Sequence, residues 1–180
     1  MTHLPLAYSA PQSDHRDWLA LATKGAALTA LLFSGAIFGF FYAWVCSTMW
    51  GLDQADPRTA IAAMQAMNAS VRNMVFAPAF FGTPFVMWIA AIMAWSMRKT
   101  GAASAFAAGG VVYACGGLIL TMTVNVPMNE ALATIDVPTD IEKARAIWTA
   151  YSEDWQVYNV IRTVFSGITL TLAGIGLLRL

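Results

Sequence analysis

The stretch TGAASAFAAGGVVYACGGLILTMTVNVPMN, residues 100–129, decides the fold because it runs for 30 residues without a charged side chain. As a helix rising 1.5 Å per residue, about 20 mainly apolar residues cross the hydrocarbon core of a bilayer. Three further charge-free stretches cover residues 25–52, 73–97 and 163–178, and the last is long enough when it is extended back to Asn159. The sequence therefore predicts four membrane-spanning helices, at about residues 19–45, 75–97, 102–124 and 159–178.

The composition agrees with a membrane location. Hydrophobic residues make up 58% of the chain and charged residues 11%, against about 25% charged residues in a typical soluble protein. Ten basic residues balance ten acidic ones, so the basic surface that nucleic-acid binding requires is absent and no nucleic-acid partner is expected. Backbone exposed to lipid must satisfy its own hydrogen bonds, and apolar stretches of this length favour helices over the short alternating strands of a barrel.

We therefore expect an all-α fold, an integral membrane four-helix bundle with up-down-up-down topology. Residues 1–17 form a polar N-terminal arm, and residues 18–180 form a single domain in the lipid bilayer. Between the first two spans, Asp56 is a candidate N-cap and Pro57 occupies the first helical position, which predicts a short interfacial helix. Arg98, Lys99 and Gly101 leave room only for a tight turn, so the second and third spans should be antiparallel neighbours.

A long helix is expected to run into the fourth span. Thr139 and Glu142 have the spacing of a capping box directly after Pro138, which places the start of this helix near residue 139. The basic Arg98–Lys99 turn and the nearby Lys24 favour the cytoplasmic side. Both termini are then expected in the cytoplasm, in a bacterial inner membrane, and eight of the ten acidic residues lie in the loops on the opposite side.

Polar residues gather near that opposite side. Thr121, Asn125 and Asn129 follow one another at spacings of four and therefore lie on one face of the third span. Two amides at the membrane boundary need hydrogen-bonding partners, and two interpretations are open. They can join helices, at about 0.6 to 2 kcal/mol per hydrogen bond in a membrane, or they can form a polar wall of a ligand pocket.

Arg162 is the most informative residue of the chain. A cation at the start of the fourth span costs a few kcal/mol unless it snorkels, pairs with an acid or faces a polar cavity. Arg162 shares a helical face with Trp155 and Asn159, and this face ends on the same side as the two amides of the third span. A cluster of an arginine and several amides with aromatic walls is expected, serving either as a small-molecule site or as a structural network.

Other residues belong to the same layer of the bundle. At the entry of the second span these are Asn68, Arg72 and Asn73, and the carboxylates near enough in depth to act as counter-ions or proton acceptors are Glu130, Glu153 and Asp154. No metal site is expected, because both histidines, His3 and His15, lie on the N-terminal arm. The ten methionines are spread over several segments, as apolar filling is.

Four segments of the chain resemble a known family. They are GAIFGFFYAWVCSTMWGL (residues 35–52), AAMQAMNASVRNMVFAPAFFGTP (62–84), NVPMNEAL (125–132) and W-x-x-Y-x-x-x-W-x-x-x-N-x-x-R (148–162). Together they resemble the anthrone-oxygenase-like family of small four-helix membrane proteins, over about residues 28–178. Much of this family is classified as a domain of unknown function. The resemblance singles out Asn125, Pro127 and Asn129 in the third span, and Trp155, Asn159 and Arg162 at the fourth.

The resemblance implies oxidation of a lipophilic aromatic or quinonoid compound by O2, without metal, flavin or other cofactor. An acidic C–H of a polycyclic phenol-ketone would lose its proton, and the carbanion would then react with O2. In this interpretation the catalytic residues are Arg162, Asn125, Asn129 and Glu130, with the cation and amides stabilising an oxyanion and Glu130, or else Asp154, acting as the base. The substrate-binding residues would be Trp155, Asn159, Tyr151, Asn68 and Arg72.

Two other classes of function remain open. The chain could be a non-catalytic subunit of a larger membrane complex, or a lipid- or quinone-binding protein, in which the same polar cluster joins helices. A transporter or channel is a third class, although four spans would need a homo-oligomer to enclose a pathway. The sequence alone does not choose among these functions.

Overall fold

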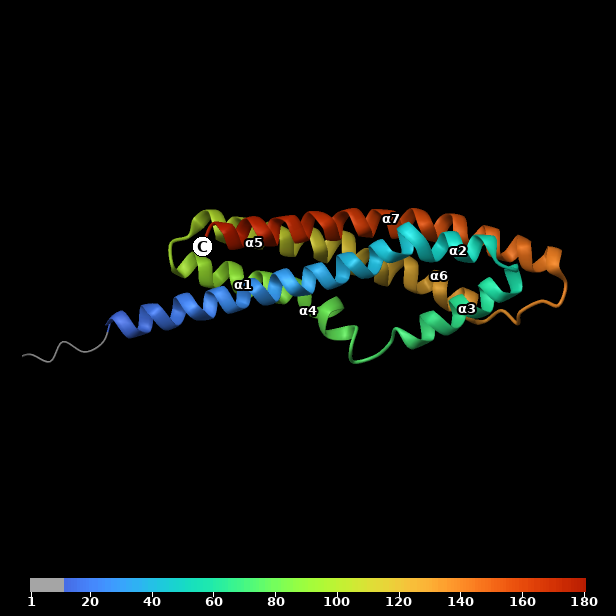
Figure 1. Ribbon diagram of the computed structural model, residues 1–180, viewed down its shortest axis with the longest axis horizontal. Coiled ribbons are helices and arrows are strands. Elements are labelled where there is room, and N and C mark those ends of the chain that lie inside the picture. Colours follow the sequence, from blue (N-terminus) through green and yellow to red (C-terminus); the bar gives the residue numbers. More distant parts are fainter. Residues whose placement is uncertain (1–11) are drawn as a thin grey trace, which may run out of the picture.

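The computed structural model describes residues 12–180, with side chains from Asp17 onward, and every regular element in that part of the chain is a helix. Four long helical rods run along the long axis of the molecule (Figure 1). The first joins α1 (Gln12–Ala43), a π-helical segment η1 (Trp44–Thr48) and α2 (Met49–Gln54). The second is α4 (Ala77–Ser96). The third joins α5 (Thr100–Tyr113), π-helical segments η2 (Ala114–Ile119) and η3 (Thr121–Asn125), and α6 (Val126–Ala133). The fourth is α7 (Ile141–Leu178), and the short α3 (Pro57–Ser70) lies between the first two.

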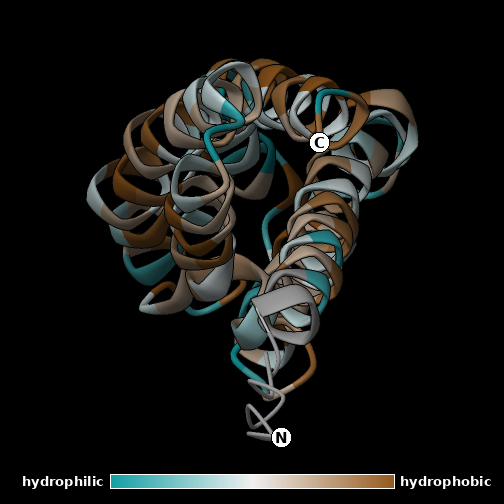
Figure 2. Cartoon of the chain, turned by 90° about the vertical axis from the view of Figure 1, so that its left-hand side faces the viewer, coloured by the Kyte–Doolittle hydropathy of each residue, from teal (hydrophilic) through white to brown (hydrophobic). Residues whose placement is uncertain are grey.

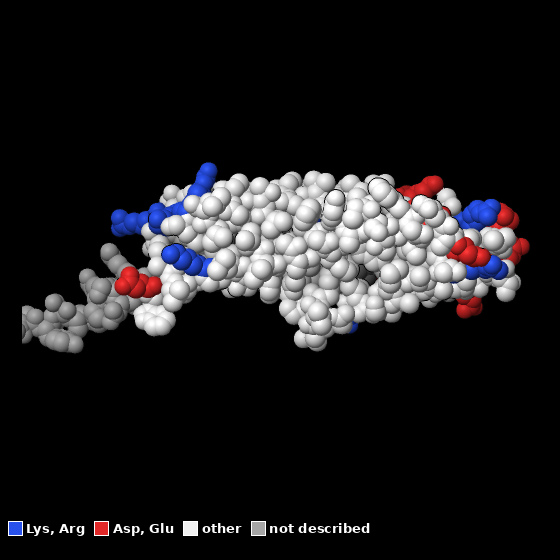
Figure 3. Space-filling model, in the orientation of Figure 1, with Lys and Arg blue, Asp and Glu red and all other residues white. Residues whose placement is uncertain are grey.

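All four rods are long and apolar enough to cross a membrane. Lysine, arginine, aspartate and glutamate gather at the two ends of the molecule and leave a broad uncharged middle (Figure 3). Apolar residues also lie on the outer faces of the helices (Figure 2), and Leu32 and Ile92 are 71% and 69% exposed. In water such a surface would be unfavourable, whereas in a bilayer it contacts lipid. The predicted all-α bundle with four membrane-type helices is confirmed.

The helices form a closed ring in which α1 packs on α4, α4 on α5, α5 on α7 and α7 on α1. The start of α1, the α4–α5 turn and the C-terminus lie at one end, and α2, α3, α6 and the start of α7 lie at the other (Figure 1). This is the predicted up-down-up-down order. That both termini of the chain lie in the cytoplasm remains a prediction.

The connections agree with the sequence in part. Asp56 caps α3, because its Oδ1 accepts the N–H of Arg58 at 2.9 Å, and Pro57 is the first helical residue. The tight turn between α4 and α5 is present, with Arg98 in the left-handed region at φ 60°. The long helix into the fourth span is present as α7 and begins near residue 139 as predicted, but the expected capping residue, Thr139, is not its N-cap. Asp140 is the N-cap, and its Oδ1 accepts the N–H groups of Glu142 and Lys143, each at 2.9 Å.

Most of the predicted polar N-terminal arm, including His3, lies outside the described residues. Its last part, residues 12–17, belongs to α1, which begins earlier than the first predicted span. The side chain of His15 also lies outside the described part. The arm therefore remains a prediction for residues 1–11.

Glycines bring the third rod and α7 together at the end of the bundle that holds the C-terminus and at its middle. A Cβ added to Gly116 would overlap the ring of Phe165, and one added to Gly176 would stand 2.7 Å from Cζ of Phe106. No other residue type allows an approach this close. This half of the bundle is therefore tightly packed.

The other half of the bundle has an incomplete wall. α4 begins only at Ala77, whereas the third rod, which packs beside it, continues through α6 to Ala133. Residues 71–76 cross the gap and are held by Asn73, whose Oδ1 accepts the N–H groups of Val75 and Phe76 at 2.8 and 3.0 Å. The late start of α4 leaves space beside α3, and this space contains the candidate site.

Candidate functional site

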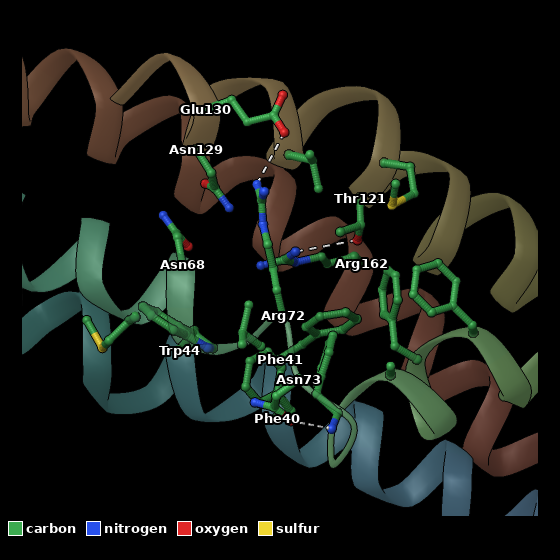
Figure 4. A pocket seen from close by; sticks show the side chains of 18 of the residues that line it. Phe40, Phe41, Trp44, Asn68, Arg72, Asn73, Thr121, Asn129, Glu130 and Arg162 are labelled. Carbon is green, nitrogen blue, oxygen red and sulfur yellow. Dashed lines mark hydrogen bonds and ion pairs between the residues drawn. The ribbon is translucent and has the colours of Figure 1, made fainter. Parts of the chain in front are cut away.

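A cavity of about 490 Å³ lies where α4 begins, between α1, α3, α4, the third rod and α7. Figure 4 shows how its side chains converge from these elements. Seven of the residues that line it are aromatic, namely Phe40, Phe41, Trp44, Phe76, Phe80, Phe81 and Trp155. Its polar lining consists of Asn68, Arg72, Asn73, Thr121, Asn129, Glu130 and Arg162. A mainly apolar cavity with a few convergent polar groups is the usual form of a small-molecule site.

Arg162 projects from α7 into the cavity wall and is only 5% exposed. Its Nε donates to Oδ1 of Asn159 at 2.9 Å, and its Nη1 donates to Oγ1 of Thr121 at 3.4 Å. The guanidinium carbon lies 4.3 Å from the ring centroid of Phe41 and 4.9 Å from that of Trp155. Among the side chains that the structure describes, no carboxylate lies within ion-pair distance of Arg162. Neutral groups alone hold this buried cation.

Asn159 supports Arg162 from behind. Its side chain is 1% exposed and does not line the cavity. Its Nδ2 donates to the backbone oxygen of Phe41 at 3.2 Å, while its Oδ1 accepts from Arg162. Asn159 therefore links α7 to α1 and orients the guanidinium.

Asn129 is oriented by two donors from α7. Its Oδ1 accepts from the Tyr151 hydroxyl at 2.7 Å and from Nε1 of Trp155 at 2.9 Å. An indole N–H can only donate, so the amide oxygen must face α7. The Nδ2 group of Asn129 then points toward the cavity, as Figure 4 shows. Tyr151 does not line the cavity and acts from behind, where Asn68 contacts its hydroxyl at 3.5 Å.

Arg72 and Glu130 form the charged rim of the cavity. Nη2 of Arg72 lies 3.2 Å from Oε1 of Glu130, and the two side chains are 60% and 59% exposed. An exposed pair of this kind contributes at most about 1 kcal/mol. Glu130 lines the cavity, whereas the exposed Glu153 and Asp154 do not.

Asn125 lies apart from the cavity. It is completely buried, it is absent from the lining, and neither its Nδ2 nor its Oδ1 has a hydrogen-bond partner among the described residues. An unsatisfied buried amide costs about 1 to 3 kcal/mol. The structure thus places six of the nine predicted site residues at the cavity and two behind it, and Asn125 at neither position.

Sequence reasoning missed the wall that the first rod contributes, with Phe41 of α1 and Trp44 of η1. Phe41 is 1% exposed and contacts the guanidinium, and the ring of Trp44 lies 5.2 Å from that of Trp155. Both residues belong to the run FFYAW at 40–44, in which Tyr42 is 49% exposed on the outer face. The run signals an aromatic segment, but only the packing of α1 decides which rings turn inward.

The arrangement suits a planar molecule that carries an oxygen atom. Aromatic walls can enclose its rings, while Arg162 and the Nδ2 of Asn129 offer N–H donors to the oxygen. Such preorganised donors stabilise negative charge that develops on an oxygen during a reaction. Among the described side chains, no group of three His, Cys, Asp or Glu residues is placed to hold a metal ion.

A family model described as anthrone oxygenase matches residues 70–172, which is more than half of the chain. The matched region contains the rim, the third rod and the part of α7 that carries Arg162. No curated protein and no solved structure matches the chain.

Proposed function

Since the chain belongs to the anthrone oxygenase family, we propose that its cavity binds a lipophilic aromatic compound within the membrane and oxidises it with O2. The substrate class is a polycyclic or quinonoid phenol-ketone, and the substrate itself supplies the electrons. No metal or flavin takes part in this reaction. The observation that carries the proposal is the buried, uncompensated charge of Arg162.

A buried cation without an acid is costly. Removing an ion from water costs several kcal/mol even after the protein relaxes, and the neutral partners of Arg162 offset only part of this cost. An oxyanion in the cavity would supply the missing counter-charge. The free-energy cost of burying the cation is therefore explained if Arg162 binds a ligand rather than stabilises the fold.

The depth of Arg162 supports a lipophilic ligand. Sixteen residues separate it from Leu178 at the end of α7, which corresponds to about 24 Å along the helix. With one boundary of the hydrocarbon core, about 30 Å thick, placed at Leu178, the cation lies inside the core, near the boundary opposite the C-terminus. With both termini in the cytoplasm of a bacterial cell, the cavity lies near the outer boundary of the inner membrane.

The proposed reaction converts a ring CH2 into a carbonyl. Loss of a proton from carbon gives an enolate, which transfers an electron to O2 to form a carbon radical and superoxide. Their recombination makes a carbon–oxygen bond and gives a peroxide, which takes up the proton removed in the first step. Cleavage of the O–O bond with loss of the second ring C–H proton then releases water and gives the quinone. One O2 is consumed and one water is released for each CH2 oxidised.

Three groups of residues have roles in this reaction. Arg162 and the Nδ2 of Asn129 hold the enolate oxygen, and the rings of Phe41, Trp44 and Trp155 enclose the aromatic body. Glu130 lines the cavity and is the candidate base, for which it must leave its ion pair with Arg72. Asn159 and Tyr151 position these groups, and Asn68 contributes to the wall.

The test is O2 uptake by the purified protein with an anthrone, with the quinone measured in the same sample. We expect equal amounts of O2 consumed and quinone formed, in the presence of a metal chelator. Arg162→Gln should abolish uptake. The matched control is Arg145→Gln, because Arg145 lies on the same helix, pairs with Glu142 at 3.0 Å and is 58% exposed. Equal uptake by both variants, or uptake that the chelator abolishes, would contradict the proposal.

A second candidate function is binding without turnover. It is favoured by the ion pair of Glu130, since among the residues that line the cavity no other carboxylate is present to accept a proton. In that case the protein would retain an aromatic or quinone ligand without consuming O2, as a lipid- or quinone-binding protein. Partner chains that remain bound in mild detergent would further indicate a subunit of a larger membrane complex.

A further inference from the structure

We propose that the end of the bundle that holds the C-terminus binds the phosphate headgroup of an anionic phospholipid. The binding surface, which we call the basic end, consists of Lys24 of α1, Arg98 and Lys99 of the α4–α5 turn, and Arg179 after α7. It lies at the opposite end of the bundle from α3 and α6, and therefore away from the cavity. The inference does not depend on the proposed function.

The α4–α5 turn brings the four cations together. Oγ1 of Thr23 on α1 donates to Sδ of Met97 at 3.3 Å, and each of these two residues directly precedes a residue of the basic end. A Cβ added to Gly101 would stand 3.3 Å from Cδ of Arg179, so this arginine lies against the start of α5. Figure 3 shows lysine and arginine side chains gathered at this end of the molecule.

The cations of the basic end have no acidic partner among the described side chains. The three ion pairs found there are formed by Arg58, Arg72 and Arg145, all toward the opposite end of the bundle. On the side of the basic end, Asp17 is the one acidic side chain that the structure describes. A surface of unpaired lysines and arginines attracts anions, and the arginine fork is well suited to phosphate.

Arg98 occupies a backbone position that favours glycine. Its φ is 60°, in the left-handed region, directly after the end of α4. The N–H of Lys99 donates to the oxygen of Ala94 at 2.9 Å, and the N–H of Arg98 donates to that of Trp95 at 2.8 Å. This is the Schellman arrangement, in which glycine usually takes the left-handed position because a side chain strains the backbone there. A strained residue that carries a charge indicates a use for that charge.

The basic end lies at a boundary of the membrane. α4 has 20 residues, which corresponds to about 30 Å and matches the thickness of the hydrocarbon core. The turn that follows α4 therefore reaches the level of the lipid phosphates. Trp18 and Trp95 are 68% and 67% exposed near this level, as tryptophans at membrane interfaces are.

A phospholipid fits this surface better than a free phosphate ion. Its phosphate would contact the cations, while its acyl chains would lie along the exposed apolar side chains of the outer faces, such as Ile92. A phosphate ion would make only the first of these contacts. Each basic residue near an anionic membrane surface strengthens the attraction by about fivefold, so a lipid with net negative charge is preferred over a zwitterionic one.

The experiment measures binding of the first lipid by native mass spectrometry of the purified protein in detergent. The protein is titrated with phosphatidylglycerol, or with phosphatidylcholine of the same acyl chains. Lys99→Gln/Arg179→Gln removes two cations of the basic end. The matched control, Arg58→Gln/Arg145→Gln, makes the same change in net charge at the opposite end, where the two side chains are 43% and 58% exposed. Inorganic phosphate in excess is the competitor.

We expect the natural protein to bind phosphatidylglycerol at least about tenfold more tightly than phosphatidylcholine. Lys99→Gln/Arg179→Gln should lower this preference by at least about fivefold, whereas the control should keep it. Inorganic phosphate should not release the bound lipid. An equal loss of preference in both double variants, release of the lipid by phosphate, or no preference in the natural protein would overturn the proposed lipid site.

Arg98→Gly separates a role in lipid binding from a role in the fold. Glycine adopts a φ of 60° without strain, so the Tm of this variant in detergent without added phospholipid should equal or exceed that of the natural protein. Its preference for phosphatidylglycerol should fall by at least about threefold. A lower Tm together with an unchanged preference would show that Arg98 stabilises the turn, and would contradict its place in the lipid site.

Discussion

Replacing Arg162 by methionine tests whether this residue binds a ligand or stabilises the fold. Methionine has a similar length and no charge, so it can fill the space of the arginine stem without carrying an ion into the bundle. If the cation is retained for a ligand, the variant should fold as well as the natural protein and lose binding. If the cation joins the helices, the variant should unfold more easily.

The structure gives the size of each contribution. Methionine loses the 2.9 Å charge-assisted hydrogen bond to Asn159, worth about 1.5 to 3 kcal/mol. It also loses the two ring contacts at 4.3 and 4.9 Å, each worth about 0.5 to 2 kcal/mol. Against these losses stands the cost of several kcal/mol for burying an ion, which the variant avoids. The opposing contributions are of similar size, so the free energy of unfolding should change by less than about 2 kcal/mol.

Two measurements on the same sample check this prediction. In a chain of this size about 1 kcal/mol shifts the melting temperature by 2 to 4 °C, so the midpoint in detergent should remain within about 8 °C of the natural value. Binding of 2-methyl-1,4-naphthoquinone should fall by at least about one hundredfold. Arg162→Lys keeps the charge without the planar fork and should retain part of the binding. If the Arg162→Met variant fails to fold, or folds and binds normally, Arg162 is not retained for a ligand.

Three further predictions concern the fold. Gly116→Ala should lower the free energy of unfolding by about 1 to 3 kcal/mol because the new Cβ meets the ring of Phe165. The control, Gly39→Ala, should be neutral or stabilising, because its new Cβ has no neighbouring atom within 4 Å. Thermal melts of the two variants measure the difference. Asp53→Ala should lower the free energy of unfolding by about 2 to 4 kcal/mol, because the Asp53 carboxylate accepts hydrogen bonds from three donors on α7. An unchanged Tm in the Asp53→Ala variant would contradict this prediction. Hydrogen bonds from Arg58 lower the pKa of Asp56 from 3.8 to about 2. The Asp56 cap therefore stabilises α3 fully above about pH 4, and this stabilisation is lost as the pH falls toward 2. Over that range the difference in Tm between the natural protein and the Asp56→Ala variant should shrink.

The fold was largely predictable because its signals are local. Charge-free stretches of about 20 residues report membrane helices whatever surrounds them, and Asp56 followed by Pro57 marks the start of α3. The N-cap of α7 was misplaced by one residue because Thr139 and Asp140 are both good caps. The close contacts of Gly116 and Gly176 could not be foreseen, because they depend on which residues of another helix lie opposite.

The site was predictable in its principal residue and less so in its surroundings. Arg162 stands out in any reading of the sequence, since a charge near a membrane span needs an explanation. Asn125 and Asn129 look equivalent in the sequence, being four residues apart on one helix. In the structure Asn129 is oriented by two α7 donors and lines the cavity, whereas Asn125 is buried without a partner.

The amino-acid sequence is enough to predict four membrane-type helices, their order along the chain, and a polar layer around Arg162 near one end. These features follow from apolar length, charge placement and helical spacing, which are properties of single segments. The packing of the helices sets three other features: α4 begins late enough to leave a cavity, Phe41 of α1 and Trp44 of η1 form one of its walls, and Asn129 rather than Asn125 lines it. These features depend on how far each helix extends beside its neighbours and which way it is rotated, and both are set by packing between segments that lie far apart in the chain.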